Sequence, residues 1–202
     1  MLESSIKVIL LGGSGTGKTN IIKALVNRPF DESSNSTLTS SFISKKININ
    51  NREYHLELWD TAGQEIYRSL TKLFLVDSKI VIFVYDITQK STFEELDFWI
   101  KTAKDNLGDT PIYAIFGNKK DLYIDEQVEE QEGKKKAEEL EAYFKLTSAK
   151  TERDFISKYI VDLTEQYIKK YGKNNIEEQS HREVSFSLQY KDKGKKKVTC
   201  CK

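Results

Sequence analysis

Cysteine is nearly absent from this 202-residue chain, and the only two are Cys200 and Cys201. Two neighbouring cysteines cannot join distant segments, so a disulfide framework is excluded and a reducing, intracellular compartment is expected. No apolar run reaches the ~18 residues that a membrane-spanning helix needs. The opening stretch "MLESSIKVILLGG" lacks a basic segment and a small-residue cleavage site, so we expect no secretory signal peptide.

Excess charge of either sign is lacking too. Lys and Arg number 32 against 31 Asp and Glu, which gives a formal net charge of +1. A nearly neutral chain creates no whole-molecule field for a polyanion, so we expect no nucleic-acid partner. Hydrophobic residues make up 38% and charged residues 31% of the chain, proportions that suit a soluble globular protein. The length predicts one domain.

Apolar runs alternate with helical patterns over most of the chain. Buried strands are predicted for "IKVILLGG", "KIVIFVYDIT" and "PIYAIFGNK", and a short strand is predicted for "YFKLTSAK". Two more strands are predicted around a turn at Asn50-Asn51. Four helices are predicted. The first follows the glycine-rich segment and stops near Pro29, and the second begins at Ser91 with a capping box to Glu94. The third lies near 129–143, and the fourth runs from about Thr151 to Tyr171. This alternation predicts an α/β fold with a mostly parallel sheet covered on both faces.

The apolar periodicity fades at the carboxyl end. Residues 173–202 contain eight Lys or Arg and four Asp or Glu, a net charge of +4. We therefore divide the chain into a folded domain, 1–172, and a flexible basic tail, 173–202.

The segment "GGSGTGKT" (residues 12–19) follows the first predicted strand and opens the first helix. It matches the phosphate-binding pattern G-x-x-x-x-G-K-[ST] in the strand–helix context that this pattern requires. Glycines let the backbone wrap around phosphate, and N–H groups at a helix N-terminus face the anion. Lys18 can reach the outer phosphates, and the Thr19 hydroxyl can bind Mg²⁺. The alternative is an ordinary glycine-rich turn, and the loop alone does not specify the base.

Four further features occur in the order, and near the spacing, found in small Ras-like GTPases. They are Thr37 in the polar loop 31–41, "WDTAGQE" (59–65), "NKKD" (118–121) and "TSAK" (147–150). The chain resembles that family over about residues 5–172. The resemblance implies the small G-protein form of the P-loop NTPase fold: a mostly parallel six-stranded sheet with one antiparallel strand, and helices on both faces.

The resemblance also implies GTP or GDP as the bound nucleotide. The Asp121 carboxylate would accept hydrogen bonds from two guanine N–H groups that adenine does not offer. Lys119 and Phe30 would cover the two faces of the base, and Asn118 would tie its segment to the phosphate loop or contact the base. The Ala149 N–H would donate to guanine O6, while Ser148 and Lys150 would brace its loop. The full set of implied nucleotide contacts is Ser14, Gly15, Thr16, Gly17, Lys18, Thr19, Asn20, Phe30, Thr37, Gly63, Asn118, Lys119, Asp121, Ser148, Ala149 and Lys150.

For catalysis, the resemblance implies that Gln64 orients the attacking water and that Lys18 holds the phosphates, because positioning and charge stabilisation do most of the work in phosphoryl transfer. Thr19 and Thr37 would ligate Mg²⁺, and Asp60 would hold the ion through water.

Release of the γ-phosphate would act as a switch. The Thr37 and Gly63 loops would both contact the group that is lost, so hydrolysis would free both of them. No arginine lies in residues 31–41 to act in cis. We therefore expect slow turnover of GTP and an activating protein that supplies an arginine.

Several features resemble the Rab branch of this family, including "VYDIT", "STFEELDFWI" and "YRSL". Phe42, Trp59 and Phe74 fall at the positions of an aromatic triad that shapes the Rab effector surface; ordinary core aromatics are the alternative. Thr39 stands where Rab proteins usually have a glycine, "LFLVDS" (73–78) departs from the usual "YYRGA", and Leu146 replaces a common glutamate. The first two departures lie on the surface that partners read, so the effectors and exchange factors stay open.

The cysteine pair resembles the doubly prenylated end of Rab proteins. One lipid chain binds a bilayer marginally while two anchor stably, and the basic run "KDKGKKK" favours an anionic leaflet. The trailing Lys202 departs from the usual tail. The resemblance implies a monomer that attaches reversibly from the cytoplasm to the cytosolic face of an intracellular membrane, with an endosome suggested by Ser40 and Ser41. Its partners would be an exchange factor, an activating protein, a GDP dissociation inhibitor or escort protein, and effectors.

Two other classes stay open from the sequence. A GTP-loaded scaffold with little hydrolysis would share the fold but would not need Gln64. A P-loop ATPase or small-molecule kinase would share only the phosphate loop.

Overall fold

The computed structural model describes residues 5–32, 41–61 and 68–171. Residue contacts divide the chain into two units, Met1–Glu165 and Gln166–Lys202. All six strands and the candidate site lie in the first unit, and of the second only residues 166–171 are described. Among the helices in these ranges, none has both the length and the apolar character needed to cross a membrane.

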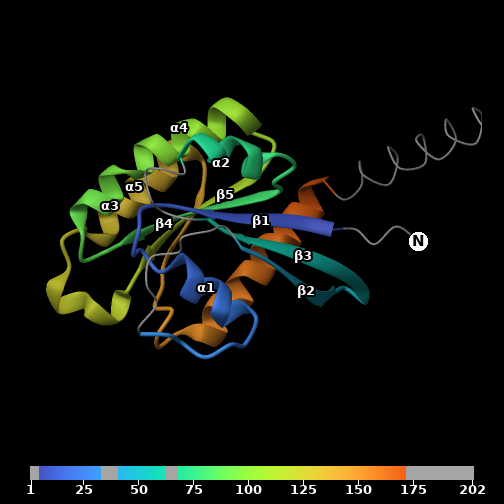
Figure 1. Cartoon of the computed structure of the whole chain (residues 1–202), viewed down its shortest axis with the longest axis horizontal. Helices are drawn as coiled ribbons and strands as arrows, with labels where there is room; N and C mark the ends of the chain where they lie inside the picture. The colour runs from blue at the N-terminus through green and yellow to red at the C-terminus, as the bar shows by residue number, and fades with distance from the viewer. Residues whose placement is uncertain (1–4, 33–40, 62–67, 172–202) are drawn as a thin grey trace, which may run out of the picture. The chain divides into compact units, whose positions relative to one another are not determined.

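Six strands form one sheet in the order β2-β3-β1-β4-β5-β6 (Figure 1). β2 runs antiparallel to β3, and the other neighbouring pairs are parallel. The predicted sheet, mostly parallel with one antiparallel strand, is thus confirmed. The strands are β1 (Ser5–Leu11), β2 (Ser41–Ile49), β3 (Arg52–Asp60), β4 (Ile80–Asp86), β5 (Ile112–Asn118) and β6 (Tyr143–Leu146).

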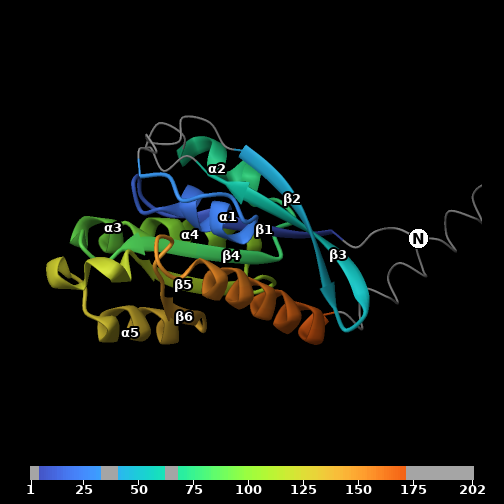
Figure 2. The same ribbon diagram turned by 90° about the horizontal axis from the view of Figure 1, so that it is seen from below.

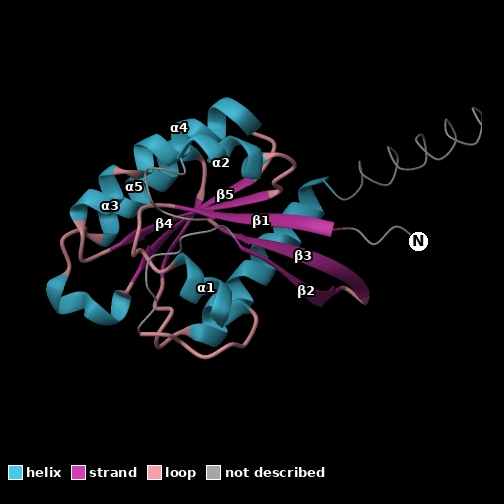
Figure 3. Ribbon diagram, viewed as in Figure 1, coloured by secondary structure: helices cyan, strands magenta, loops and turns pink. Residues whose placement is uncertain are grey.

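Helices cover both faces of this sheet. α2, α3 and α4 lie on one face and α1 lies on the other (Figures 1 and 3), and Figure 2 shows the same layers from below. The helices are α1 (Lys18–Leu25), α2 (Arg68–Leu75), α3 (Lys90–Glu94), α4 (Leu96–Leu107), a 3₁₀ helix (Lys120–Asp125), α5 (Glu130–Leu140) and a last helix over residues 153–171.

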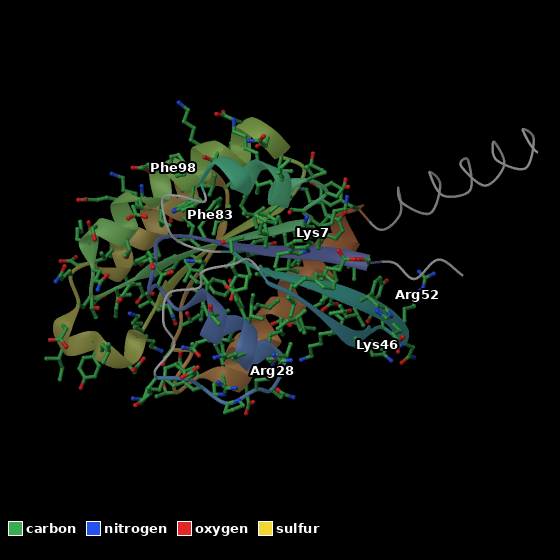
Figure 4. All side chains as sticks on the ribbon, in the orientation of Figure 1. Lys7, Arg28, Lys46, Arg52, Phe83 and Phe98 are labelled. Atoms are coloured by element: carbon green, nitrogen blue, oxygen red, sulfur yellow. The ribbon has the colours of Figure 1, made fainter. Side chains whose placement is uncertain are left out.

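The central strands are apolar because both of their faces are covered. All seven positions of β4 and of β5 are buried, which is why each appears in the sequence as a continuous hydrophobic run. Phe83 of β4 is fully buried, whereas Phe98 on the outer side of α4 is 38% exposed (Figure 4). One core cluster joins β1, β4 and β5 to α2, α4 and α5; its aromatic members are Trp99, Phe83, Tyr85, Phe93 and Tyr113.

The predicted turn between the first two strands of the sheet edge is confirmed. Asn50 and Asn51 have φ values of 51° and 61°, and they connect β2 directly to β3. A two-residue turn with positive φ at both positions matches the right-handed twist of the strands, and asparagine tolerates this conformation better than most residues.

The predicted capping box at Ser91 and Glu94 is wrong. α3 begins at Lys90, so Ser91 lies inside the helix, and the N-cap residue Gln89 makes no side-chain capping bond. Thr92 closes this turn instead: its hydroxyl donates to the Gln89 carbonyl at 2.7 Å and accepts from the Asp86 N–H at 3.0 Å. The chain then divides at Glu95 into α3 and α4, where one helix was predicted.

Candidate nucleotide-binding site

The phosphate loop leaves the carboxyl end of β1 and enters α1, and two of its glycines cannot be replaced without a clash. Gly12 has a φ of 148°, and a Cβ there would lie 2.0 Å from the Val84 carbonyl oxygen. Gly17, the N-cap of α1, has a φ of 95°, and its Cβ would lie 2.3 Å from Nδ2 of Asn118. The pattern of glycines in the sequence therefore reflects close approach of this loop to β4 and β5.

Lys18 is folded back over this loop. Its ammonium donates to the carbonyl oxygens of Gly12 at 2.9 Å and Gly13 at 2.7 Å, and the residue is 5% exposed. Burial lowers the pKa of Lys18 to about 8, against the opposing effect of the Asp60 and Glu95 carboxylates. The ammonium therefore stays largely protonated at neutral pH, which suits it to bind a phosphate.

Thr19 and Asp60 meet beside the phosphate loop. The Thr19 hydroxyl donates to Oδ2 of Asp60 at 2.7 Å, and Asp60 is the last residue of β3. Within the described ranges, Oδ1 of Asp60 is buried without a hydrogen-bond partner, and burial raises the pKa of this carboxyl. A bound cation would relieve both features, and hydroxyl and carboxylate oxygens are donors that Mg²⁺ accepts. The residues present thus fit the ion.

The same pair does not form a metal site without other ligands. The described parts of the chain contain no cluster of three or more His, Cys, Asp or Glu side chains that would hold a metal ion. Mg²⁺ commonly keeps several waters and binds through one or two protein oxygens together with substrate phosphates. Thr19 and Asp60 therefore fit an ion that arrives with a nucleotide.

Asn118, at the end of β5, holds three loops together. Its Nδ2 donates to the Thr16 carbonyl at 2.9 Å, so it ties its segment to the phosphate loop, the first of the two roles considered for it. Its Oδ1 accepts from the Ala149 N–H at 3.2 Å and the Thr147 hydroxyl at 3.3 Å. The Ala149 N–H, expected to donate to guanine O6, is thus directed at Asn118 in this structure.

Asp121 lies in the first turn of the 3₁₀ helix, where its carboxylate is braced from the next loop. Ser148 donates to Oδ1 of Asp121 at 2.6 Å, and the Thr151 N–H in turn donates to the Ser148 hydroxyl at 3.0 Å. The bracing role expected of Ser148 is therefore seen in the geometry. A fixed carboxylate with unused acceptor capacity suits recognition of neighbouring N–H donors.

Lys150 and Phe30 meet at the start of the polar loop. Nζ of Lys150 lies 2.7 Å from a Glu32 carboxylate oxygen and 6.0 Å from the centre of the Phe30 ring. Lys150 was expected to brace its own loop, but it reaches across to the segment of Phe30 and Glu32 instead. The ion pair lowers the pKa of Glu32 and raises that of Lys150.

The side chain of Asn20 bonds to the backbone of Asp31. Its side-chain amide donates to the Asp31 carbonyl at 3.1 Å and accepts from the Asp31 N–H at 3.2 Å. Lys23 adds an ion pair to the Asp31 carboxylate at 3.0 Å. The side chain of Asn20 is therefore committed to the start of the polar loop, and its backbone is what a nucleotide would meet.

The remaining candidates divide into two groups. Ser14 and Gly15 are exposed at the tip of the phosphate loop, with a φ of 74° at Gly15. The other candidates, Thr37, Gly63, Gln64, Cys200 and Cys201, lie outside the described residues.

Sequence reasoning missed Asp86. This residue ends β4, is fully buried, and places Oδ2 2.5 Å from Nζ of Lys119. Its place at the end of a buried apolar strand is a sequence signal for a site residue, since open α/β sheets bind ligands at the carboxyl ends of their strands.

These contacts join the carboxyl ends of β1, β3, β4 and β5 around one phosphate loop, as in the P-loop class of nucleotide-binding proteins. The model of the Ras family matches residues 7–169, and the chain belongs to the Ras family. It is therefore a small GTPase switch, of the family that binds GTP or GDP with Mg²⁺ and works with exchange factors, activating proteins and effectors. The P-loop ATPase or small-molecule kinase alternative is thereby removed.

Proposed function

We propose that this GTPase is a Rab-type switch that regulates vesicle trafficking. The observation that carries the proposal is a row of three aromatic rings on β2, β3 and α2. The rings of Phe42 and Trp59 have centroids 5.5 Å apart, and those of Trp59 and Phe74 are 5.7 Å apart. Phe42 is 50% exposed, which sets it apart from an ordinary core aromatic, whereas Trp59 and Phe74 are partly buried and pack against the core cluster.

The residues around this row support a protein-binding surface. Leu73 is 69% and Val76 is 56% exposed. Lys7 packs its ammonium 4.4 Å from the Trp59 ring centroid and donates to the Val76 carbonyl at 2.9 Å. Exposed apolar side chains beside rigidly packed aromatic rings are what the centre of a protein interface contains. We take this surface, Phe42, Trp59, Leu73, Phe74 and Val76, as the effector surface.

The proposed nucleotide contacts follow from the site. Lys18 and the amides of the phosphate loop hold the β- and γ-phosphates, and the N-terminus of α1 adds its dipole. Asp121 reads the guanine base, while the stem of Lys119 and the ring of Phe30 cover its faces. Asn118 connects the phosphate loop to residues 118–121, the base loop, and to the loop at 147–150. One hydrogen-bonded network therefore positions both ends of the nucleotide.

The proposed chemistry is in-line attack of water on the γ-phosphate, which breaks the bond from the γ-phosphorus to the β–γ bridging oxygen and yields GDP and inorganic phosphate. Thr19 and Thr37 would hold Mg²⁺, with Asp60 acting through water, and the bound ion would neutralise charge on the phosphates. Gln64 orients the water, and the Gly63 N–H contacts the γ-phosphate. Loss of that phosphate releases the loops of Thr37 and Gly63, so partners distinguish the two nucleotide states.

The proposed membrane anchor is the cysteine pair at the end of the basic tail. Prenylation of Cys200 and Cys201 would give two lipid chains, enough for stable attachment to the cytosolic face of an intracellular membrane, with an endosome suggested by Ser40 and Ser41. A dissociation inhibitor or escort protein would then carry the prenylated monomer through the cytoplasm. The alternative function, a GTP-loaded scaffold with little hydrolysis, is disfavoured by the presence of Gln64.

Thr19→Asn is expected to displace the full-length chain from its membrane. The change removes the hydroxyl that donates to Asp60 and is proposed to ligate Mg²⁺, so the variant should not reach the GTP-bound state. Effectors on the membrane bind that state, so the variant should not be retained there. Fluorescence microscopy of the tagged chain measures its distribution. Thr110→Asn is the matched control, because Thr110 is exposed just before β5, at the opposite end of the strand from Asn118.

The same experiment includes Cys200→Ser/Cys201→Ser and mass spectrometry of the native C-terminus. A membrane-bound wild type with two isoprenoid additions, and a diffuse double variant, support the Rab-type proposal. A wild type that is diffuse and carries unmodified cysteines contradicts it.

A further inference from the structure

Asp86 stands at the carboxyl end of β4, and both of its carboxylate oxygens contact other groups of the protein. One oxygen, Oδ2, is paired with Nζ of Lys119 at 2.5 Å. The other, Oδ1, accepts from the N–H of Thr88 at 2.9 Å and from its hydroxyl at 2.7 Å. The carboxylate side chain is 1% exposed. Its position is therefore fixed by three partners inside the protein.

The backbone around this carboxylate is as rigid as its side chain. Asp86 pairs with Asn118 in the parallel register of β4 and β5, and the Ile87 N–H donates to the Asn118 carbonyl at 3.1 Å. The Thr92 hydroxyl caps the Asp86 N–H at 3.0 Å. The end of β4 at Asp86 is thus held beside the end of β5, where Asn118 comes one residue before Lys119.

Lys119 also has an uncommon backbone conformation. It adopts a left-handed conformation, with φ 67° and ψ 33°, which is unfavourable for residues other than glycine, asparagine and aspartate. Its side chain is 32% exposed. A lysine ammonium ordinarily extends into solvent, but this one is held inward by Asp86. The methylene groups of Lys119 therefore form the exposed part of its side chain beside the base loop.

We propose that Asp86 is a positioning residue for the bound nucleotide: it holds the head of Lys119 so that the stem covers the guanine base. The inference rests on the role proposed for Lys119. The ion pair restricts the stem to one arrangement before nucleotide arrives, so less freedom is lost on binding. Removing Asp86 leaves the ammonium without its buried partner, and the stem is then free to swing away from the base.

Release of a fluorescent GDP analogue from the full-length chain tests this role. The protein is loaded with N-methylanthraniloyl-GDP, and release is followed during a chase with excess GDP. Asp86→Asn and Lys119→Met are each expected to accelerate release about tenfold or more. The double variant is expected to release no faster than the faster single variant, because Asp86 acts only through Lys119.

The matched control is Glu152→Gln. It breaks the ion pair of Lys120, the neighbouring lysine, whose Nζ lies 2.8 Å from the Glu152 carboxylate. Its release rate is expected to stay within about twofold of wild type, because a surface pair has little influence. Thr88→Val is a milder second variant for the case in which Asp86→Asn does not fold. It removes one donor to Oδ1 and should accelerate release only when Lys119 is present.

Each outcome decides the inference. Acceleration by Asp86→Asn or Thr88→Val that disappears in the Lys119→Met background supports it. If the fold increases in release rate of the two single variants multiply in the double variant, Asp86 acts independently of Lys119 and the inference is overturned. Fast release from Lys119→Met with wild-type release from the Asp86 and Thr88 variants overturns the inference alone. Wild-type release from Lys119→Met overturns the proposed role of Lys119 and, with it, the inference.

Discussion

Asp121→Asn is expected to lower the affinity for GDP by on the order of 10³-fold and to raise the affinity for xanthosine diphosphate. A carboxylate accepts from both guanine N1–H and the exocyclic amino group. An asparagine amide offers one acceptor and one donor, so its NH₂ group faces the guanine amino group and both are left unpaired. Xanthine carries a carbonyl oxygen where guanine carries the amino group, so the amide donor regains a partner.

Competition of GDP, xanthosine diphosphate and ADP against a fluorescent nucleotide measures this change. Asp125→Asn is the matched control, because Asp125 is exposed at the other end of the same 3₁₀ helix. It should leave all three affinities unchanged. If Asp121→Asn also leaves base preference unchanged, Asp121 does not read the base.

Gly17→Ala is expected to lower nucleotide affinity on the order of 10²- to 10³-fold. The new Cβ would lie 2.3 Å from Nδ2 of Asn118, which donates to the Thr16 carbonyl at 2.9 Å. Either the phosphate loop or Asn118 has to move, which separates the phosphate loop from the base loop. Such overpacking costs about 1–3 kcal/mol, and a positive φ costs a non-glycine residue about 1–2 kcal/mol more.

Gly15→Ala separates the two contributions. Gly15 also has a positive φ, 74°, but no atom lies within 4 Å of the Cβ it would gain. Titration calorimetry with GDP and denaturant unfolding of the nucleotide-free proteins should show the larger loss for Gly17→Ala in both measurements. Equal losses for the two variants would mean that backbone strain, rather than contact with Asn118, determines the effect.

The strands of the sheet were predictable from the sequence because their signals are local. β4 and β5 appear as continuous apolar runs since both of their faces are covered, and Asn50-Asn51 specifies a turn by its backbone preference. The phosphate loop was predictable for the same reason: its glycines and Lys18 are contiguous, and their spacing reflects one strand–helix turn.

The helices were less predictable where tertiary contacts determine their ends. α2 was not predicted, and it is only eight residues long. The start of α3 was misplaced because Thr92, rather than Ser91, bonds back to Gln89 and to the end of β4. A true capping box does occur at the start of α5, between Glu129 and Glu132, but its N-cap is a glutamate instead of the usual serine or threonine.

Two pairs of site residues that are distant in sequence escaped prediction. Asp86 meets Lys119 only because β4 and β5 are neighbours in the sheet, and Lys150 meets Glu32 only because the loops after β6 and α1 converge. No spacing rule encodes such contacts. The motifs identify which residues bind the nucleotide, whereas the sheet order determines which other residues hold them in place.

Single-turnover hydrolysis of GTP most directly tests whether this chain is a GTPase switch. The full-length protein is loaded with GTP and Mg²⁺, and conversion to GDP is followed for wild type, Gln64→Leu and Gln131→Leu, an exposed-surface control on α5. We predict slow conversion by wild type and by Gln131→Leu, with rate constants on the order of 10⁻⁴ s⁻¹ as for unstimulated Ras-type enzymes, and at least about tenfold slower conversion by Gln64→Leu. Bound GTP that persists equally in all three proteins, with or without an activating protein, would contradict the switch and favour a GTP-loaded scaffold.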